Sequence, residues 1–96
     1  MIPVHGNEDW YRGRSEPERA WAGRLRLMPA SVGPNGRSGL SFALETDQGQ
    51  LPVYAAGAEQ LLSPFAQRAV VIRGKLIDLS EEGLGLELWV GSIAGA

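Results

Sequence analysis

The sequence has no cysteine and only one histidine among its 96 residues. Without cysteine, the chain cannot form a disulfide, a thiolate metal site or a cysteine nucleophile. With His5 as its one imidazole, it also lacks the clustered histidines that many zinc sites use. These absences remove several classes of metalloprotein and most imidazole-based catalysis.

Long apolar runs and an excess of one charge sign are also missing. No stretch approaches the roughly 18 apolar residues of a membrane-spanning helix, and residues 1–9 lack the basic and apolar regions of a signal peptide. The formal net charge is -2, so the overall field does not attract nucleic acid or anionic membranes. The default prediction is a soluble, cytoplasmic protein without membrane attachment.

The length and composition fit one small domain, since 44% of residues are hydrophobic and 21% are charged. Residues 1–19 mix proline, glycine and charged residues without an apolar period, which predicts an irregular or flexible N-terminal arm. Within that arm, Trp10 and Tyr11 are expected to fold back over the end of the core. The main domain is predicted over residues 20–93, and residues 94–96 form a C-terminal tail.

Apolar and polar residues alternate in five segments, which is the pattern of half-buried strands. Leu27 and Leu86 fall among the positions predicted to face inward. Pro52 cannot donate to a strand ladder, so its strand is expected to be short or to lie at an edge. The five predicted strands cover residues 21–28, 40–46, 51–55, 70–77 and 84–93.

One segment has a helical period instead. Ala58, Leu61, Leu62 and Phe65 stand at positions i, i+3, i+4 and i+7, which places them on one face of a short helix within residues 57–66. The predicted order is therefore β-β-β-α-β-β, with the helix between strands three and four. Closing the strands into a five-stranded barrel would bury one face of each strand and let the helix cover an open end.

Three of the predicted strands resemble strands of a known family. Residues 21–25 read Trp-Ala-Gly-Arg-Leu, residues 70–76 read Val-Val-Ile-Arg-Gly-Lys-Leu, and residues 86–93 read Leu-Glu-Leu-Trp-Val-Gly-Ser-Ile. With the element order over residues 20–93, these strings resemble strands one, four and five of the OB-fold, the oligonucleotide/oligosaccharide-binding barrel. A small barrel of the SH3 kind is the alternative, but it normally lacks a helix of this length at that point.

The resemblance implies a binding face on strands two and three, flanked by loops 29–39 and 78–83. Binders of single strands present aromatic and basic residues on such a face. Here Tyr54 is its one aromatic residue, none is basic, and loop 78–83 adds carboxylates that repel phosphate. Both departures count against a nucleic-acid ligand. The predicted outward residues are Ser41, Ala43, Glu45, Gln50, Pro52 and Tyr54.

A basic patch is the main feature that favours nucleic acid. Strand one carries Arg24 and Arg26, strand four carries Arg73 and Lys75, and pairing of these strands would place the four side chains on one outer surface beside Trp89. The alternative is a set of solvated residues matched by acidic neighbours, Glu45 and Glu87. An exposed Trp89 marks either a contact site or a position covered by the N-terminal arm or by a second subunit.

Catalysis has little support in the sequence, and we predict no enzyme, no metal and no cofactor. His5, Glu8 and Asp9 lie close together, but the cluster is more typical of a solvated charged segment than of a metal site. Adjacent Glu81 and Glu82 point apart, as in a turn.

The sequence therefore predicts a non-catalytic binding or assembly module, with a protein or small polar ligand favoured as partner and a homodimer possible. The alternative is single-stranded nucleic-acid binding. The candidate contact residues for either function are Arg24, Arg26, Arg73, Lys75, Trp89 and Tyr54.

Overall fold

The computed structural model describes residues 1–28, 41–83 and 85–96. Its elements confirm a mainly β chain, with two short α-helices and two 3-10 turns. In chain order they are β1 (Ile2–Pro3), α1 (Asp9–Arg12), β2 (Glu18–Met28), β3 (Ser41–Thr46), β4 (Gly49–Tyr54), α2 (Glu59–Leu62), η1 (Ser63–Phe65), β5 (Arg68–Leu79), η2 (Ser80–Glu82) and β6 (Gly85–Gly95). The predicted loop 29–39 lies outside the described residues.

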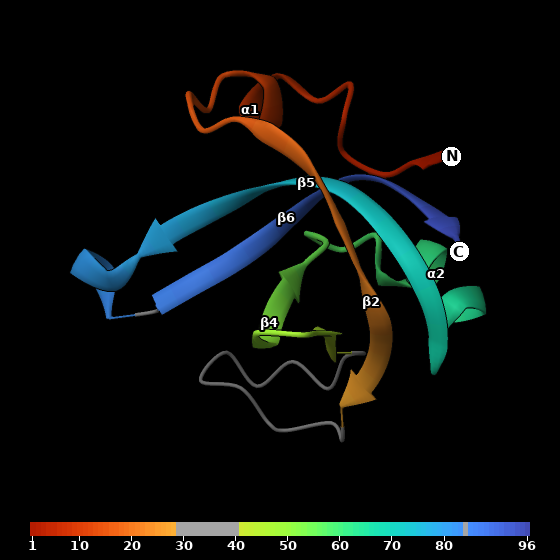
Figure 1. The fold of residues 1–96 in the computed structure, drawn as a ribbon. Coiled ribbons are helices and arrows are strands. Elements are labelled where there is room, and N and C mark those ends of the chain that lie inside the picture. The colour runs from red at the N-terminus through yellow and green to blue at the C-terminus, as the bar shows by residue number, and fades with distance from the viewer. Residues whose placement is uncertain (29–40, 84) are drawn as a thin grey trace.

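The strands form one six-stranded sheet that closes in a ring (Figure 1). β2 pairs with β3 and with β5, β3 with β4, and β6 with β5, all antiparallel. The ring closes where β4 runs parallel to β6, through Val53 opposite Leu88 and Tyr54 opposite Trp89. β1 adds to β6, with Ile2 opposite Ile93, so the two chain ends lie side by side.

The predicted position of the helix along the chain was wrong by one strand. α2 lies between the fourth and fifth strands, β4 and β5, rather than between strands three and four. The reason is β1, a pair of residues that becomes a strand only by bonding to β6 and is too short to show an apolar period. Pro64 lies in η1, where the α-helical turn of α2 has already given way to 3-10 geometry.

The core lies inside the ring and draws on every long strand and on α2. Leu62 of α2 is fully buried with the strand residues, so this short helix covers part of the core. Burial of one large aliphatic side chain contributes about 1.5–3 kcal/mol. The buried cluster comprises Leu25, Phe42, Leu44, Ala55, Leu62, Val70, Ile72, Leu88, Val90 and Ile93.

Leu27, Leu86 and Ala43 are among the positions that differ from the predicted alternation. Leu27 and Leu86 are exposed, at 38% and 43%, because each lies beyond the closed part of the ring. Leu27 follows the last β2–β5 pair, Leu25 with Arg68, and Leu86 lies where β5 and β6 run on together toward η2 (Figure 1). Ala43, predicted to face outward, is buried.

A β-bulge in β6 receives the N-terminal segment, residues 1–17. Arg73 is opposite Ser92 but Gly74 is opposite Val90, so Gly91 is an extra residue in β6. Its carbonyl accepts the N–H groups of Val4 and Gly6, at 2.8 and 2.9 Å. A Cβ at Gly91 would lie 2.6 Å from the Tyr11 hydroxyl, so only glycine permits this approach.

The N-terminal segment, for which the sequence predicted an irregular or flexible arm, packs against β5 and β6 and contains β1 and α1 (Figure 1). Tyr11 is buried and its hydroxyl donates to Glu18 at 2.7 Å. His5 is also buried, and its Nε2 donates to the Ala55 carbonyl at 2.5 Å. These contacts connect the segment to β2 and to the end of β4.

Candidate binding surface

The structure does not gather the predicted basic residues into one patch. Arg24 donates to the Gln67 carbonyl at 2.8 Å, and Arg73 pairs with Glu18 at 3.3 Å. Arg73 lies opposite Ala20, four residues before Arg24 on β2, so the two arginines are roughly 13 Å apart along the ladder. Both arginines are exposed, so they are solvated surface residues whose contacts contribute little to stability.

Arg26 has the acidic neighbour that the sequence suggested. Its guanidinium faces the Glu45 carboxylate, with Nε 3.3 Å from Oε2. The hydrogen bond from Arg26 holds the pKa of Glu45 below its usual value. The other suggested acidic partner, Glu87, instead accepts a hydrogen bond from Trp89.

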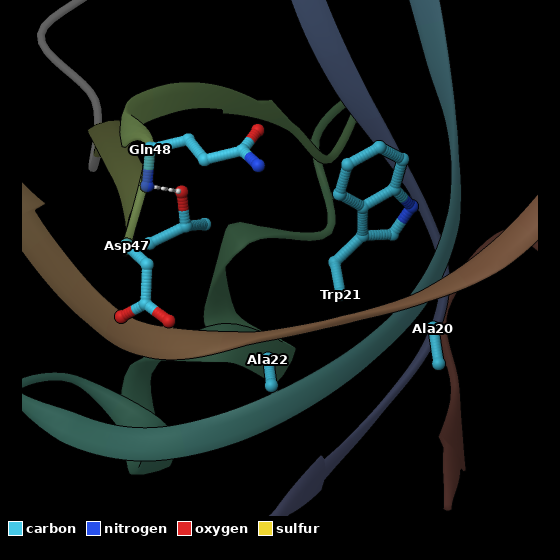
Figure 2. A pocket seen from close by; sticks show the side chains of 6 residues that line it. Ala20, Trp21, Ala22, Asp47 and Gln48 are labelled. Carbon is cyan, nitrogen blue, oxygen red and sulfur yellow. Dashed lines mark hydrogen bonds between the residues drawn. The ribbon is translucent and has the colours of Figure 1, made fainter.

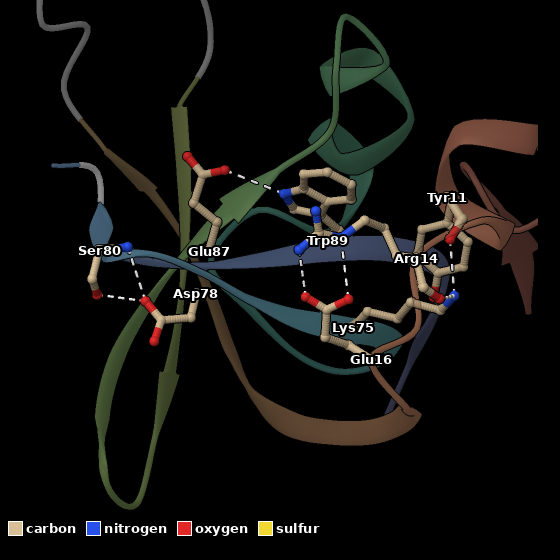
Figure 3. Close-up of polar contacts among 8 residues, drawn as sticks. All are labelled: Tyr11, Arg14, Glu16, Lys75, Asp78, Ser80, Glu87 and Trp89. Atoms are coloured by element: carbon tan, nitrogen blue, oxygen red, sulfur yellow. Dashed lines mark hydrogen bonds and ion pairs between the residues drawn. The ribbon is translucent and has the colours of Figure 1, made fainter. Parts of the chain in front are cut away.

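Lys75 does not belong to an outer patch because the N-terminal segment covers it. Only 8% of its surface is exposed, and its Nζ donates to the carbonyls of Tyr11 and Arg14, each at 2.8 Å. The same ammonium lies 4.7 Å from the centre of the Tyr11 ring. Lys75 therefore holds the segment against β5, and two of its three donors are used within the protein (Figure 3).

The two aromatic candidates lie together, joined by a third ring. Tyr54 and Trp89 are opposite each other in the parallel β4–β6 pair, with ring centres 5.6 Å apart. Trp10 of α1 lies 5.2 Å from Trp89 and 6.3 Å from Tyr54. We call Trp10, Tyr54 and Trp89 the aromatic surface. Trp10 and Tyr54 remain 41% and 40% exposed, and Trp89 is half-buried.

Local structure explains how these rings meet. In a parallel pair, directly opposed residues point to the same side of the sheet, and the inward partners here are Val53 and Leu88. Consecutive residues of a helical turn point in different directions, so burial of Tyr11 turns Trp10 outward. The sequence predicted folding back of the aromatic pair and gave covering of Trp89 by the arm as one alternative, but no sequence signal placed Trp10 beside Tyr54.

Charged groups lie next to Trp89 in the aromatic surface (Figure 3). The Arg14 guanidinium lies over the Trp89 ring, with Cζ 5.4 Å from its centre, and makes two hydrogen bonds to Glu16, at 3.1 and 2.5 Å. The hydrogen bond raises the pKa of Arg14 and lowers the pKa of Glu16. Glu87 accepts from Trp89 Nε1 at 3.2 Å. The Trp89 ring thus lies between an ion pair and a carboxylate.

The buried Tyr11 hydroxyl is not a candidate acid or base. Burial first, and then the hydrogen bond to Glu18, raises the pKa of Tyr11 well above its ordinary value. The phenol therefore stays protonated at neutral pH, and its role is to anchor the N-terminal segment to β2.

A small pocket lies elsewhere, between β2 and the β3–β4 turn (Figure 2). It measures about 250 Å³, below the usual range of small-molecule sites. The Trp21 ring forms one wall while its Nε1 donates to the Gly74 carbonyl at 3.2 Å. In Figure 2 the Gln48 side chain extends toward Trp21. The lining residues are Ala20, Trp21, Ala22, Thr46, Asp47 and Gln48.

The predicted loop 78–83 forms η2 and a left-handed Gly83. Asp78 closes this turn by accepting the Ser80 N–H at 2.9 Å, and the Ser80 hydrogen bonds lower the pKa of Asp78 (Figure 3). The three carboxylates of this loop are exposed.

Comparison with protein-family models, curated proteins and solved structures finds no match. In the described part of the chain, no helix has the length and apolar character needed to cross a membrane. Within residues 1–28, 41–83 and 85–96, no three histidine or carboxylate side chains group as metal ligands. His5, which the sequence placed beside Glu8 and Asp9, directs its Nε2 to a backbone carbonyl.

Proposed function

We propose that this chain is a non-catalytic binding module, built on an OB-like barrel, whose partner contacts the aromatic surface. The pairing order supports the barrel. Counted from β2, the first strand pairs with the second and the fourth, and the third pairs in parallel with the fifth. This is Greek-key connectivity, and α2 lies between the third and fourth of these five strands.

The observation that carries the function is the aromatic surface itself. Trp10, Tyr54 and Trp89 come from three distant parts of the chain and pack together, yet two of the rings keep about two fifths of their surface in water. Clustered exposed tryptophan and tyrosine are typical anchors of protein interfaces. The Trp21 pocket, at about 250 Å³, is below the usual range of small-molecule sites, so we place the partner on the aromatic surface instead.

Selection of peptides from a random library tests this function. Peptides enriched on the wild-type protein should bind Tyr54→Ala and Trp10→Ala at least about tenfold more weakly. Leu61→Ala is the matched control, because Leu61 is a similarly exposed apolar residue on α2, and it should bind normally. Enriched peptides that bind all four proteins equally would contradict the proposal. Amide spectra verify that each variant is folded.

Single-stranded nucleic acid is the second candidate, favoured by the Arg14 guanidinium over Trp89 beside the Tyr54 ring. Bases stack on such rings next to a cation. Titration with a mixed-sequence strand at low and moderate salt tests it. Saturable binding that weakens with salt and shifts the Trp89 and Tyr54 signals would support this candidate. If the signals do not shift even at low salt, nucleic-acid binding is excluded. Light scattering in the same samples shows whether a second copy of the chain is the partner.

A further inference from the structure

We infer that the aromatic surface receives an extended, arginine-containing segment of another polypeptide. This inference rests on the proposed function and adds the chemical class of the partner. It depends on three observations: a guanidinium that the chain itself places on this surface, the excess of carboxylates around the rings, and the spacing of the two exposed rings.

The chain's own Arg14 shows which chemistry the surface accepts. Its guanidinium lies 5.4 Å over the centre of the Trp89 ring while a carboxylate, Glu16, binds its edge. A planar guanidinium suits this arrangement better than an ammonium, because it stacks on a ring and pairs with a carboxylate at once. In the described residues, no cation lies over Trp10 or Tyr54, the two rings that face water.

The surrounding charges favour a cationic partner. Glu16 already neutralises Arg14, and Glu82 lies close enough to raise the pKa of Arg14 further. Glu87 borders Trp89, since its carboxylate accepts the indole N–H at 3.2 Å. Across the described residues, Glu87 forms no ion pair. The rim therefore carries excess negative charge, which attracts a basic segment and opposes a phosphate backbone.

The spacing of the rings favours an extended chain. The ring centres of Trp10 and Tyr54 are 6.3 Å apart. Alternate residues of an extended peptide point to one side and repeat about every 6.6 Å. Two arginines separated by one residue can therefore reach the two exposed rings, whose planes are inclined to each other by 68°.

Three short peptides test the inference, with arginine, glutamate or glutamine alternating with glycine. Tryptophan fluorescence and the ring signals of Trp10, Tyr54 and Trp89 report binding to the wild-type protein. We expect saturable binding of the arginine peptide alone, weakened by salt. Glu87→Gln, which keeps an acceptor for the Trp89 indole, should weaken it about threefold. Asp47→Asn, at the opposite end of β4 from Tyr54, removes the same charge and should leave affinity unchanged.

Equal binding of the glutamine peptide, or no effect of Glu87→Gln, would overturn the inference. An oligothymidine strand that shifts the three rings while the arginine peptide does not would also overturn it and would leave the aromatic surface as a binding site. If no peptide or strand shifts the rings at low salt, the inference fails, whereas the proposed function is decided separately by the peptides selected from the random library.

Discussion

The ammonium of Lys75 on β5 lies 2.8 Å from the Tyr11 carbonyl, beneath the N-terminal segment that brings Trp10 to the aromatic surface. This bond, with its counterpart to Arg14, connects a buried cation to the geometry of a surface site. The proposed site thus depends on how firmly residues 1–17 are held against the ring.

Substitution of Lys75 should therefore loosen the segment. Lys75→Met keeps the apolar stem but leaves two carbonyls without their donor, and we expect a loss of about 1–3 kcal/mol in the free energy of unfolding by urea. Amide exchange in α1 should accelerate as well. Arg24→Met removes an exposed cation from the same sheet and should cost less than about 1 kcal/mol. Equal losses in the two variants would contradict a special role for Lys75.

The bulge at Gly91 offers a test with a matched glycine. Gly91→Ala places a methyl group 2.6 Å from the Tyr11 hydroxyl and 3.0 Å from Glu18 Oε2, so the N-terminal segment must move. We expect a loss of about 1–3 kcal/mol in unfolding free energy. Gly95→Ala, on the same strand with no atom within 4 Å of the added carbon, should change it by less than about 0.5 kcal/mol. A stable Gly91→Ala with protected Tyr11 would refute this packing.

Two adjacent leucines test the role of α2 as a cover for the core. Leu62 is fully buried and Leu61 is 43% exposed. Leu62→Ala should therefore reduce the free energy of unfolding by about 2–5 kcal/mol, whereas Leu61→Ala should have a small effect. Thermal denaturation measures both, and similar melting temperatures for the two variants would show that α2 does not cover the core.

The Arg14–Glu16 pair predicts a pH dependence. The hydrogen bond from Arg14 lowers the folded-state pKa of Glu16 below the usual value near 4.3. Its stabilising contribution is therefore complete above that ordinary value and is lost as the pH falls through the lower folded-state pKa. Carboxyl NMR titration should show Glu16 titrating below ordinary glutamates. Arg14→Gln should return it to the ordinary range, and no change would exclude the pair in solution.

Local pattern was enough to predict the mainly β class and the five long strands, because one face of each is buried in the ring. It did not predict β1, whose two residues form a strand only through β6. Alternation placed Lys75 on the polar side of its strand, which is correct for the ring alone. Its burial arises from Tyr11 and Arg14, more than 60 positions away, where sequence period carries no information.

The candidate site was predicted only in part. Tyr54 and Trp89 were identified separately, but their contact depends on the parallel register of β4 and β6, which neither strand reveals alone. Trp10 was expected to cover the core, whereas burial of its neighbour Tyr11 turns it toward the surface. The four basic residues were grouped because their strands pair, but each has a separate partner on the protein.

The three tryptophans allow the most direct test of the central claim, because they report on two different places. Trp10 and Trp89 belong to the aromatic surface, and Trp21 lines the pocket beside Gln48. Their indole N–H signals are followed by NMR while the arginine–glycine peptide is added. We predict saturable shifts of the Trp10 and Trp89 signals, with the Trp21 signal unchanged. A shift of Trp21 while Trp10 and Trp89 stay in place would contradict it.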